Sequence, residues 1–446
     1  MPISMNKRPE PIDLLIEARW IATVDHDAVL KNHAVAIKGG RILNVLPTPE
    51  AHQRYQADTV HVLEKHILIP GLINLHTHAA MSLMRGLADD IPLMTWLEQH
   101  IWPTEAAHVS EHFVYDGTRL ACTEMIRGGI TCFNDMYFFP DAAARAAADS
   151  GMRAVIGITT LEFPTAYASD ADDYLAKGLA TREKWLQNPL THFCLAPHAP
   201  YTVSDRSFER IATLSAQLNL PIHCHIHETR HELQESLTRH GSHPLKRLQQ
   251  LGLTGPNFIG VHAVHMNRME MEWLAETGCH IAHCPTSNLK LASGIAPVAE
   301  MQHLGINIGL GTDGAASNNR IDMFQEMRLA ALLAKGTSGN ASCLPASQVL
   351  QMATLNAARA LGLGNEIGSI TPGKSADLCA VSMDTPECKP CFDPVSHLVY
   401  VAGREHVSHV WIAGKCCMEH KNLRNKDQYQ LDSAIALWQN NLQFRG

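Results

Sequence analysis

Two histidines spaced two residues apart, His76 and His78, end the apolar segment GLINLHTH. On a β-strand this spacing places both imidazoles on the same face, directed at one point. Neutral imidazole nitrogens are frequent ligands of zinc and similar divalent metals. The pair therefore predicts half of a metal site. The alternative is two histidines that only end a buried strand.

Seven further segments share this arrangement of an apolar run, a polar end and a following helical pattern. In chain order the eight segments are GLINLHTH, GITCFNDM, RAVIGITT, HFCLAPHAP, LPIHCHIHE, NFIGVHAVH, CHIAHCPTSN and NIGLGTDG. Eight strands that alternate with helices predict an α/β protein with a (β/α)8 TIM barrel, whose functional residues lie at the C-terminal ends of the strands. The polar residues at these ends are His76, His78, His198, His225, Glu228, His262, His283 and Asp313.

Short runs of alternating apolar and polar residues at both ends of the chain predict a second domain. They lie between Ile12 and Val62 and again in GSITPGKSADLCAVSM and VSHVWIAGKCCM. Neither set is long enough to bury a core alone. We therefore expect residues 1–66 and 367–446 to form one small β-sandwich domain of antiparallel strands, with an amphipathic helix over residues 427–442. Residues 67–366 would form the barrel.

Composition indicates a globular protein with a large core, because 46% of the 446 residues are apolar and only 18% are charged. The net charge of -8 and the lack of a basic stripe argue against nucleic acid or an anionic membrane as partner. Neither a signal peptide nor an apolar stretch of about 18 residues is evident, so we expect a cytoplasmic protein. The twelve cysteines lie in apolar contexts typical of reduced thiols, and Cys388 and Cys391 form a CxxC without a second pair.

A catalytic metal needs ligands from rigid elements and one position for water. The first, fifth and eighth predicted strands would supply His76, His78, His225 and Asp313. His223 and His227 share a face with His225 on a regular strand, so spacing alone does not choose among them. The fourth strand has no lysine that could bridge two metals. We therefore predict one divalent ion, zinc, with iron or manganese as alternatives; its activated water would suit attack on a ring carbon.

The sequence resembles the amidohydrolase superfamily and, within it, the 5'-methylthioadenosine/S-adenosylhomocysteine deaminases. The resemblance covers nearly the whole chain and rests on GLINLHTH, WLEQHIWPTE, APHAPYTVS, HCHIHET, VHAVH, HCPTSNLKLASGIAPV, GTDGAASNNRIDMFQEMR and PGKSADL. It implies hydrolytic deamination of the adenine of a small nucleoside, with methylthioadenosine and adenosine as leading substrates and S-adenosylhomocysteine as a further candidate. We also expect a homo-oligomer.

The resemblance assigns a role to each candidate residue. The family's metal ligands correspond to His76, His78, His225 and Asp313. Its proton-shuttling glutamate corresponds to Glu228 and its water-orienting histidine to His262, with Asp313 sharing the catalytic work. Substrate contacts would come from Glu105, His198, Trp96, Glu228 and Asp313, with Glu105 accepting both ribose hydroxyls. The alternatives are a helix-capping acid at Glu105 and a core indole at Trp96.

The substrate pocket departs from the family pattern, because Ile158 stands where one of two substrate arginines would be. We therefore expect an apolar pocket for the 5' substituent, with Leu87, Met84 and Trp96 as candidates, and weak recognition of a charged tail. Should S-adenosylhomocysteine bind well, an arginine such as Arg153 would have to reach the site. His265 would be a packed or solvated imidazole, and His283 would either contact the substrate or support the barrel rim.

Other functions fit the sequence less well. Guanine or pterin deamination and triazine dechlorination use the same scaffold, but a free base has no ribose diol for Glu105. A non-catalytic scaffold has no reason to keep all four ligands with Glu228. Residues 227–231 match the HExxH protease signature, which needs a helix and here follows a strand. Residues 287–290 match SxxK without the accompanying KTG, which indicates a loop coincidence.

Overall fold

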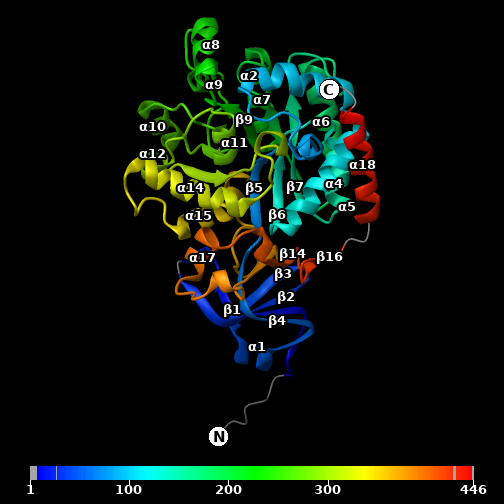
Figure 1. Ribbon diagram of the computed structural model, residues 1–446, viewed down its shortest axis with the longest axis vertical. Coiled ribbons are helices and arrows are strands. Elements are labelled where there is room, and N and C mark those ends of the chain that lie inside the picture. The colour runs from blue at the N-terminus through cyan, green and yellow to red at the C-terminus, as the bar shows by residue number, and fades with distance from the viewer. Residues whose placement is uncertain (1–7, 27, 425–427, 444–446) are drawn as a thin grey trace.

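The computed structural model describes residues 8–26, 28–424 and 428–443, which contain a barrel and a smaller sheet (Figure 1). Each of the eight predicted segments forms one barrel strand, and neighbouring strands pair in parallel. The strands are β5 (Leu72–Thr77), β6 (Ile130–Asp135), β7 (Arg153–Thr160), β8 (Thr191–Pro197), β9 (Ile222–Ile226), β10 (Phe258–His262), β11 (His280–His283) and β12 (Asn307–Leu310). The sequence prediction of a (β/α)8 barrel is confirmed.

The barrel strands are apolar because both of their faces are covered. Side chains such as Leu75, Val155 and Val261 fill the interior, and the outer faces pack against the surrounding helices. The barrel closes where β12 meets β5. There the Asn74 amide donates to Thr312 Oγ1 at 2.8 Å, and the Asp313 backbone N–H donates to the His76 carbonyl at 3.0 Å. Closure therefore brings two predicted metal ligands together.

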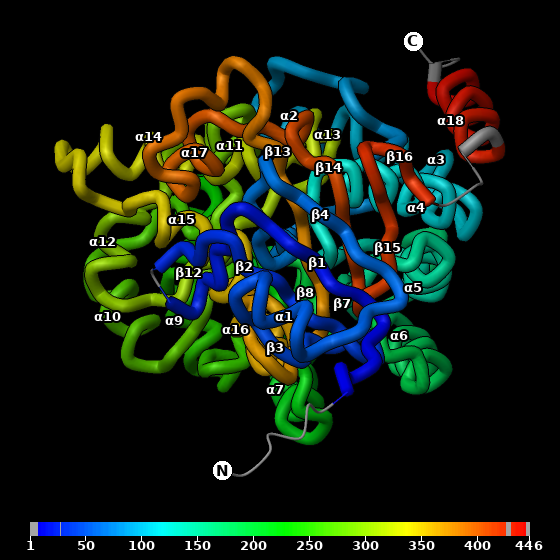
Figure 2. Tube along the Cα trace, turned by 90° about the horizontal axis from the view of Figure 1, so that it is seen from below, coloured from blue at the N-terminus to red at the C-terminus, as the bar shows by residue number. Residues whose placement is uncertain are grey.

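Strands from both chain ends form the second sheet, in the order β16-β15-β14-β13-β4-β1-β2-β3 (Figure 2). They are β1 (Glu10–Ala22), β2 (Val29–Lys38), β3 (Arg41–Pro47), β4 (Tyr55–Pro70), β13 (Leu378–Ser382), β14 (Val407–Ile412), β15 (Lys415–Glu419) and β16 (Asn422–Leu423). A shared core that includes Ile16, Leu378 and Trp411 explains why neither end could fold alone. The expected domain is thus one mixed sheet around a common core.

One strand pair in this sheet departs from the antiparallel pattern expected from the sequence. β1 and β4 are parallel, with Glu10 opposite Tyr55. The cause is α1 (Thr48–Arg54), which carries the chain back across the sheet before β4 begins. β4 ends at Pro70, and β5 begins at Leu72 in the barrel. The domain boundaries at residues 66 and 367 stay a prediction.

Helices surround the barrel, and α18 lies against α4 (Figure 1). The Trp438 indole donates to Asp116 Oδ2 at 2.9 Å and packs on Phe113. The predicted start of this terminal helix, residue 427, lies outside the described residues. The helical segments are α1 (Thr48–Arg54), η1 (Ala79–Met84), α2 (Leu93–Trp96), η2 (Leu97–Ile101), α3 (Trp102–His108), α4 (Glu111–Arg127), α5 (Pro140–Asp149), α6 (Ala171–Trp185), α7 (Asp205–Leu218), α8 (Arg230–His240), α9 (Pro244–Gln250), α10 (Arg268–Thr277), α11 (Pro285–Lys290), α12 (Val298–His303), α13 (Ala315–Asn318), α14 (Met323–Ser338), α15 (Ala346–Met352), α16 (Leu355–Ala360), η3 (Pro386–Cys388), α17 (Pro394–Tyr400), η4 (Arg404–His406) and α18 (Gln428–Gln443).

Within the described residues, no helix combines the length and the apolar character needed to cross a membrane. All twelve cysteines are free thiols, and most are buried. Cys388 of the CxxC is buried, Cys391 is partly exposed, and neither belongs to a group of potential metal ligands among the described residues.

Candidate metal centre and substrate pocket

Metal-binding side chains converge at the C-terminal end of the barrel, beside the seam between β5 and β12. Nε2 of His76 and Nε2 of His78 each lie 3.3 Å from Asp313 Oδ1. Nε2 of His225 lies 3.3 Å from Nε2 of His76. The four predicted ligands therefore direct their donor atoms at one another, as a shared divalent ion requires.

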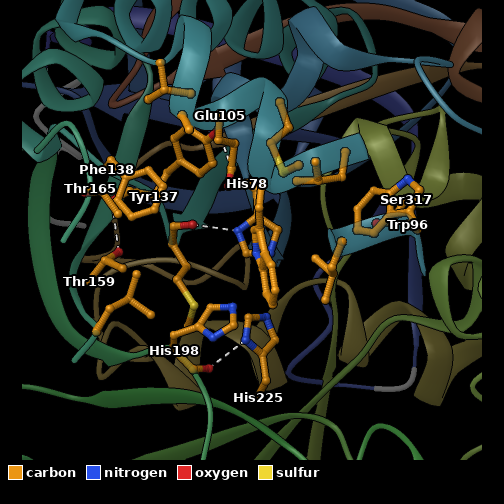
Figure 3. Close-up of a pocket in the computed structure, with 18 of the residues that line it drawn as sticks. His78, Trp96, Glu105, Tyr137, Phe138, Thr159, Thr165, His198, His225 and Ser317 are labelled. Carbon is orange, nitrogen blue, oxygen red and sulfur yellow. Dashed lines mark hydrogen bonds between the residues drawn. The ribbon is translucent and has the colours of Figure 1, made fainter. Parts of the chain in front are cut away.

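Hydrogen bonds behind these imidazoles fix which nitrogen faces the centre. Nδ1 of His78 donates to the Met136 carbonyl at 2.6 Å, and Nδ1 of His225 donates to the His198 carbonyl at 2.7 Å (Figure 3). Each of these rings, if neutral, keeps its lone pair on Nε2, which is the atom in the cluster. Bonds of this kind orient histidine ligands in metal sites generally.

The structure distinguishes the three histidines of β9 and its end, which the spacing left equivalent. His225 joins the cluster, while His223 lies behind it with Nε2 at 3.0 Å from His76 Nδ1. His227 adopts a φ of 51°, and its Nε2 accepts the Leu245 backbone N–H at 3.1 Å. His223 thus supports His76, and His227 connects the strand end to α9.

Asp313 is fixed by its backbone as well as its side chain. Its φ of 62° is unusual for a non-glycine residue and turns the chain sharply after β12. Oδ1 accepts the Gly314 backbone N–H at 2.7 Å, and Oδ2 accepts the Ser287 hydroxyl at 2.6 Å. Burial alone would raise the pKa of Asp313, but the imidazoles of His76 and His78 beside it hold this pKa well below its ordinary value. The carboxylate is therefore ionised and ready to bind a cation.

Glu228 and His262 lie beside the cluster and face each other. Nε2 of His262 is 3.9 Å from Glu228 Oε2, and its Nδ1 is 2.8 Å from Asn288 Oδ1. Glu228 accepts the Ser293 hydroxyl at 3.3 Å. Burial raises the pKa of Glu228. A carboxyl of raised pKa holds a proton closer to neutral pH and is suited to general acid–base chemistry.

A buried carboxylate that the sequence did not single out positions Glu228. The two oxygens of Glu232 accept the backbone N–H groups of His227 and Glu228 at 2.9 and 2.8 Å. Thr229 Oγ1 in turn accepts the Glu232 backbone N–H at 3.2 Å. The spacing Thr229-x-x-Glu232 is that of a capping box, so the sequence did contain a pattern from which a structural role of Glu232 could have been predicted. Ser287 belongs to the SxxK match that the sequence analysis interpreted as a loop coincidence. Its hydroxyl nevertheless has a structural role, because it donates to Asp313.

The cluster opens into a cavity of about 540 Å³, a volume typical of small-molecule sites. Metal-cluster and catalytic candidates form one wall: His78, His198, His225, Glu228, His262 and Asp313. Aromatic side chains form much of the rest: Trp96, Trp102, Tyr137, Phe138, Phe163, Tyr167 and Tyr201. Among the described residues that line the cavity there is no lysine or arginine.

The segment from α2 to α3 brings Glu105 and Trp96 to this cavity (Figure 3). It includes a single turn of π-helix, Leu97–Ile101, a feature often found at functional sites. Glu105 accepts the Tyr137 hydroxyl at 2.7 Å and caps no helix in this contact. Burial raises the pKa of Glu105 to about 7, against the lowering effect of the Tyr137 hydroxyl. Trp96 is buried but still lines the cavity.

The structure corrects the sequence prediction at the distal end of the pocket. Ile158 packs against α6, where a Cβ added at Gly178 would lie 2.2 Å from Ile158 Cγ2, and Thr159 is the residue of β7 that lines the cavity. The identity of residue 158 therefore carries no information about the 5' pocket. Met84 and Leu87 are also not among the lining residues.

Three further residues named from the sequence lie away from the cavity wall. Arg153 is buried at the opposite end of β7, with Nε at 2.8 Å from Asp377 Oδ2, so it cannot serve as a substrate clamp. His283 is buried but does not line the cavity. His265 is held by the Ser293 carbonyl, to which its Nε2 donates at 2.8 Å.

Comparison with known proteins gives consistent matches across the chain. Residues 67–417 match the model of the amidohydrolase family. A 5-methylthioadenosine/S-adenosylhomocysteine deaminase from Saccharophagus degradans is 44% identical over 97% of each chain. A 5'-deoxyadenosine deaminase from Methanosarcina mazei is 41% identical over 94% of this chain and 96% of its own.

A solved structure gives the same result. An adenosine deaminase from Xanthomonas campestris with bound zinc superposes with a TM-score of 0.96, at 46% identity, over 98% of this chain and 99% of its own. Because the family model and full-length relatives agree with the barrel and its histidine cluster, this protein belongs to the amidohydrolase family.

Proposed function

We propose that this protein is a metal-dependent hydrolase that deaminates the adenine of a small nucleoside, giving the inosine analogue and ammonia. One observation carries the proposal: the histidine–aspartate cluster, Glu228 and Glu105 all face a single cavity. That cavity offers a site for hydrolysis at one end and a carboxylate for a ribose diol at another. The relatives named above are deaminases of adenine nucleosides, which supports this substrate class.

The residues present fit a zinc-class ion. His76, His78 and His225 offer imidazole nitrogens and Asp313 a carboxylate oxygen, a donor set suited to a borderline divalent metal. Such an ion would lower the pKa of a bound water towards neutrality. We propose one ion in this centre, as zinc, with iron or manganese as alternatives.

Proton movements would be carried by side chains of the cavity wall. His262 and Asp313 lie where they would orient the attacking water and take its proton. Glu228 would protonate the ring nitrogen next to the carbon under attack. It would then take the proton of the added hydroxyl as the ring carbonyl forms, and would deliver that proton to the departing amine, which leaves as ammonia. The 3.9 Å between Glu228 Oε2 and His262 Nε2 allows both groups to serve the same reacting carbon.

The lining of the cavity favours a nucleoside with an apolar 5' substituent. Glu105 offers a carboxylate to the two ribose hydroxyls, which a free guanine or pterin lacks. His198 and Trp96 would contact the nucleoside as well. The aromatic walls suit a methylthio or deoxy group, whereas the amino-acid tail of S-adenosylhomocysteine finds no lysine or arginine among the described lining residues.

Ultraviolet assays of the zinc-loaded protein test this function. We expect turnover of methylthioadenosine at least equal to that of adenosine, slower turnover of S-adenosylhomocysteine, and none of guanine. Removal of the metal with a chelator should abolish turnover, and zinc should restore it. Guanine turnover without adenosine turnover would overturn the proposal; S-adenosylhomocysteine as the best substrate would overturn the assignment of the 5' pocket.

The assembly and compartment proposed from the sequence, a homo-oligomer in the cytoplasm, stay predictions. Light scattering of the purified protein measures the first directly. A single protomer mass would exclude the oligomer.

A further inference from the structure

A second group of histidines lies in the small sheet, away from the barrel cavity. One nitrogen of His61, one of His409 and a carboxylate oxygen of Glu419 lie within 4.8 Å of one another. They come from β4, β14 and β15, which the proposed deaminase reaction does not use. His409 and its neighbour Trp411 are almost fully buried, and His61 and Glu419 are mostly buried.

Hydrogen bonding determines which nitrogen of His409 is available. The Ser408 hydroxyl lies 2.8 Å from Nδ1 of His409 and 3.2 Å from the Ala380 carbonyl oxygen, so Nδ1 has a partner on the protein. Nε2 of His409, by contrast, is buried and has no hydrogen-bond partner among the described residues. An unpaired buried polar atom is costly and calls for a partner.

The remaining two groups are held so that they face the same place. Nδ1 of His61 lies 3.5 Å from Glu419 Oε1. Arg424 forms an ion pair with the other carboxylate oxygen, Glu419 Oε2, which leaves Oε1 directed at His61. The site thus places a buried imidazole nitrogen without a partner, His409 Nε2, beside a second imidazole and a carboxylate oxygen that face each other.

We propose that His61, His409 and Glu419 form a second metal site, which binds a divalent transition-metal ion of the zinc class. The rings of His420 and His66 lie 4.6 and 6.0 Å from the ring of His409, so further imidazoles border the site. A group rich in imidazole selects zinc, copper or nickel over calcium and magnesium, which prefer oxygen ligands. Three protein ligands leave a position for water.

An ion here would link strands that backbone hydrogen bonds do not join at this position. β13 pairs with β4 only from His66 to Pro70, so His61 lies beyond the end of this ladder. The β14–β15 hairpin carries the other two ligands. The ion would therefore stabilise the small domain and would take no part in the reaction of the barrel.

Metal stoichiometry tests the proposal on the full-length protein. Equilibrium dialysis against zinc, followed by elemental analysis, should find two ions per chain in the unaltered protein. His61→Gln, Glu419→Gln and His409→Phe should each bind one. The matched control is His52→Gln, because His52 also pairs with a glutamate of the small domain, Glu17 at 2.9 Å, but belongs to no group of potential metal ligands among the described residues. This variant should keep two ions.

Trp411 provides a local readout that does not depend on turnover. Its ring stacks on His409 at 5.6 Å between centroids and an interplanar angle of 8°. Copper added to the zinc-loaded protein should quench a component of fluorescence that is missing in Trp411→Phe and much reduced in His61→Gln. His61 keeps some exposure while His409 is almost fully buried, so we expect His61→Gln to disturb the core less than His409→Phe.

Specific results would overturn the second site. One is saturation of the unaltered protein at a single zinc ion while adenosine is still deaminated; another is two ions bound by folded His61→Gln and Glu419→Gln. Deaminase activity, measured in parallel, should be the same in all these variants. Because activity reports on the barrel and stoichiometry on the small sheet, failure of one proposal is distinguishable from failure of the other.

Discussion

At the scale of single residues, the raised pKa of Glu228 is the feature that separates a deaminase from a passive metal protein. Burial favours the protonated carboxyl, which a proton donor to the purine ring must be, and outweighs the opposite effect of the His262 imidazole on this pKa. The carboxyl contacts no other described carboxylate, and Ser293 holds one of its oxygens. Its role should therefore be separable from metal binding.

Replacement of this carboxyl tests the role. Glu228→Gln should keep the barrel metal and lose at least roughly a hundredfold in kcat, the usual contribution of a positioned acid–base group. Elemental analysis and steady-state kinetics on the same preparation measure both quantities. Turnover within a few-fold of the unaltered enzyme would show that another group moves the proton.

Glu105 should discriminate between ribose and deoxyribose. Hydrogen bonds to a charged carboxylate contribute about 1.5 to 3 kcal/mol each, and one is lost with 2'-deoxyadenosine. We expect kcat/KM for 2'-deoxyadenosine to fall roughly tenfold to a hundredfold below that for adenosine. In Glu105→Ala most of this gap should close. A gap that persists unchanged in the variant would assign the diol to another residue.

The pKa of Glu105 adds a pH dependence to this selectivity. Burial raises that pKa to about 7, so the carboxyl is protonated and a weaker acceptor below neutral pH, and ionised above it. The ratio of kcat/KM for adenosine over 2'-deoxyadenosine should therefore increase by about fivefold between roughly pH 6 and pH 8, the difference between a charged and a neutral hydrogen bond. Taking the ratio of the two kcat/KM values removes the effect of other groups whose titration changes the turnover of both substrates equally. A flat ratio would contradict the assignment.

At the scale of elements, the strand ends were the most predictable part of the site. Buried apolar runs specify the eight barrel strands, and the fold then places their polar ends on one rim. The sequence spacing of the three histidines could not distinguish His225 from His223 and His227. The turn at His227 depends on a φ of 51°, and the neighbouring residues do not predict this conformation. The Tyr137–Glu105 hydrogen bond could not be predicted either, since it joins the loop after β6 to a separate helix, α3.

The loop after β9 is an element that can be tested through Glu232. Its carboxylate accepts two backbone N–H groups, and so holds Glu228 in place without touching the cavity. Glu232→Ala should lower kcat by about tenfold or more while barrel zinc is kept, since a small misplacement of a catalytic group is costly. Glu232→Gln, which retains one acceptor oxygen, should recover part of the rate. Equal rates in both variants would remove the positioning role.

At the scale of the whole molecule, a buried ion pair connects the barrel to the small sheet. Arg153, at the start of β7, donates to both oxygens of Asp377 at 2.8 and 3.1 Å. Asp377 also accepts the Ser375 hydroxyl and the Ala413 backbone N–H, and its carbonyl accepts the Gly71 N–H just before β5. The arginine suggested for the substrate is thus part of the interface that keeps the two sheets together.

Breaking this pair should destabilise the protein without changing its chemistry. Asp377→Ala leaves a buried guanidinium unpaired, which should lower the free energy of unfolding by about 3 to 5 kcal/mol. The exposed ion pairs of Asp384 with Lys65 and Lys389 give the matched control, and Asp384→Ala should leave the urea midpoint almost unchanged. Urea unfolding measures both, while kcat of the folded fraction should stay unchanged. The expected loss of stability comes from the charge that is left without a partner. The double variant Arg153→Met with Asp377→Leu should therefore be less destabilised than Asp377→Ala alone. If the double variant were as unstable as the single one, the ion pair itself, and not the unpaired charge, would account for the stability of the interface between the two sheets.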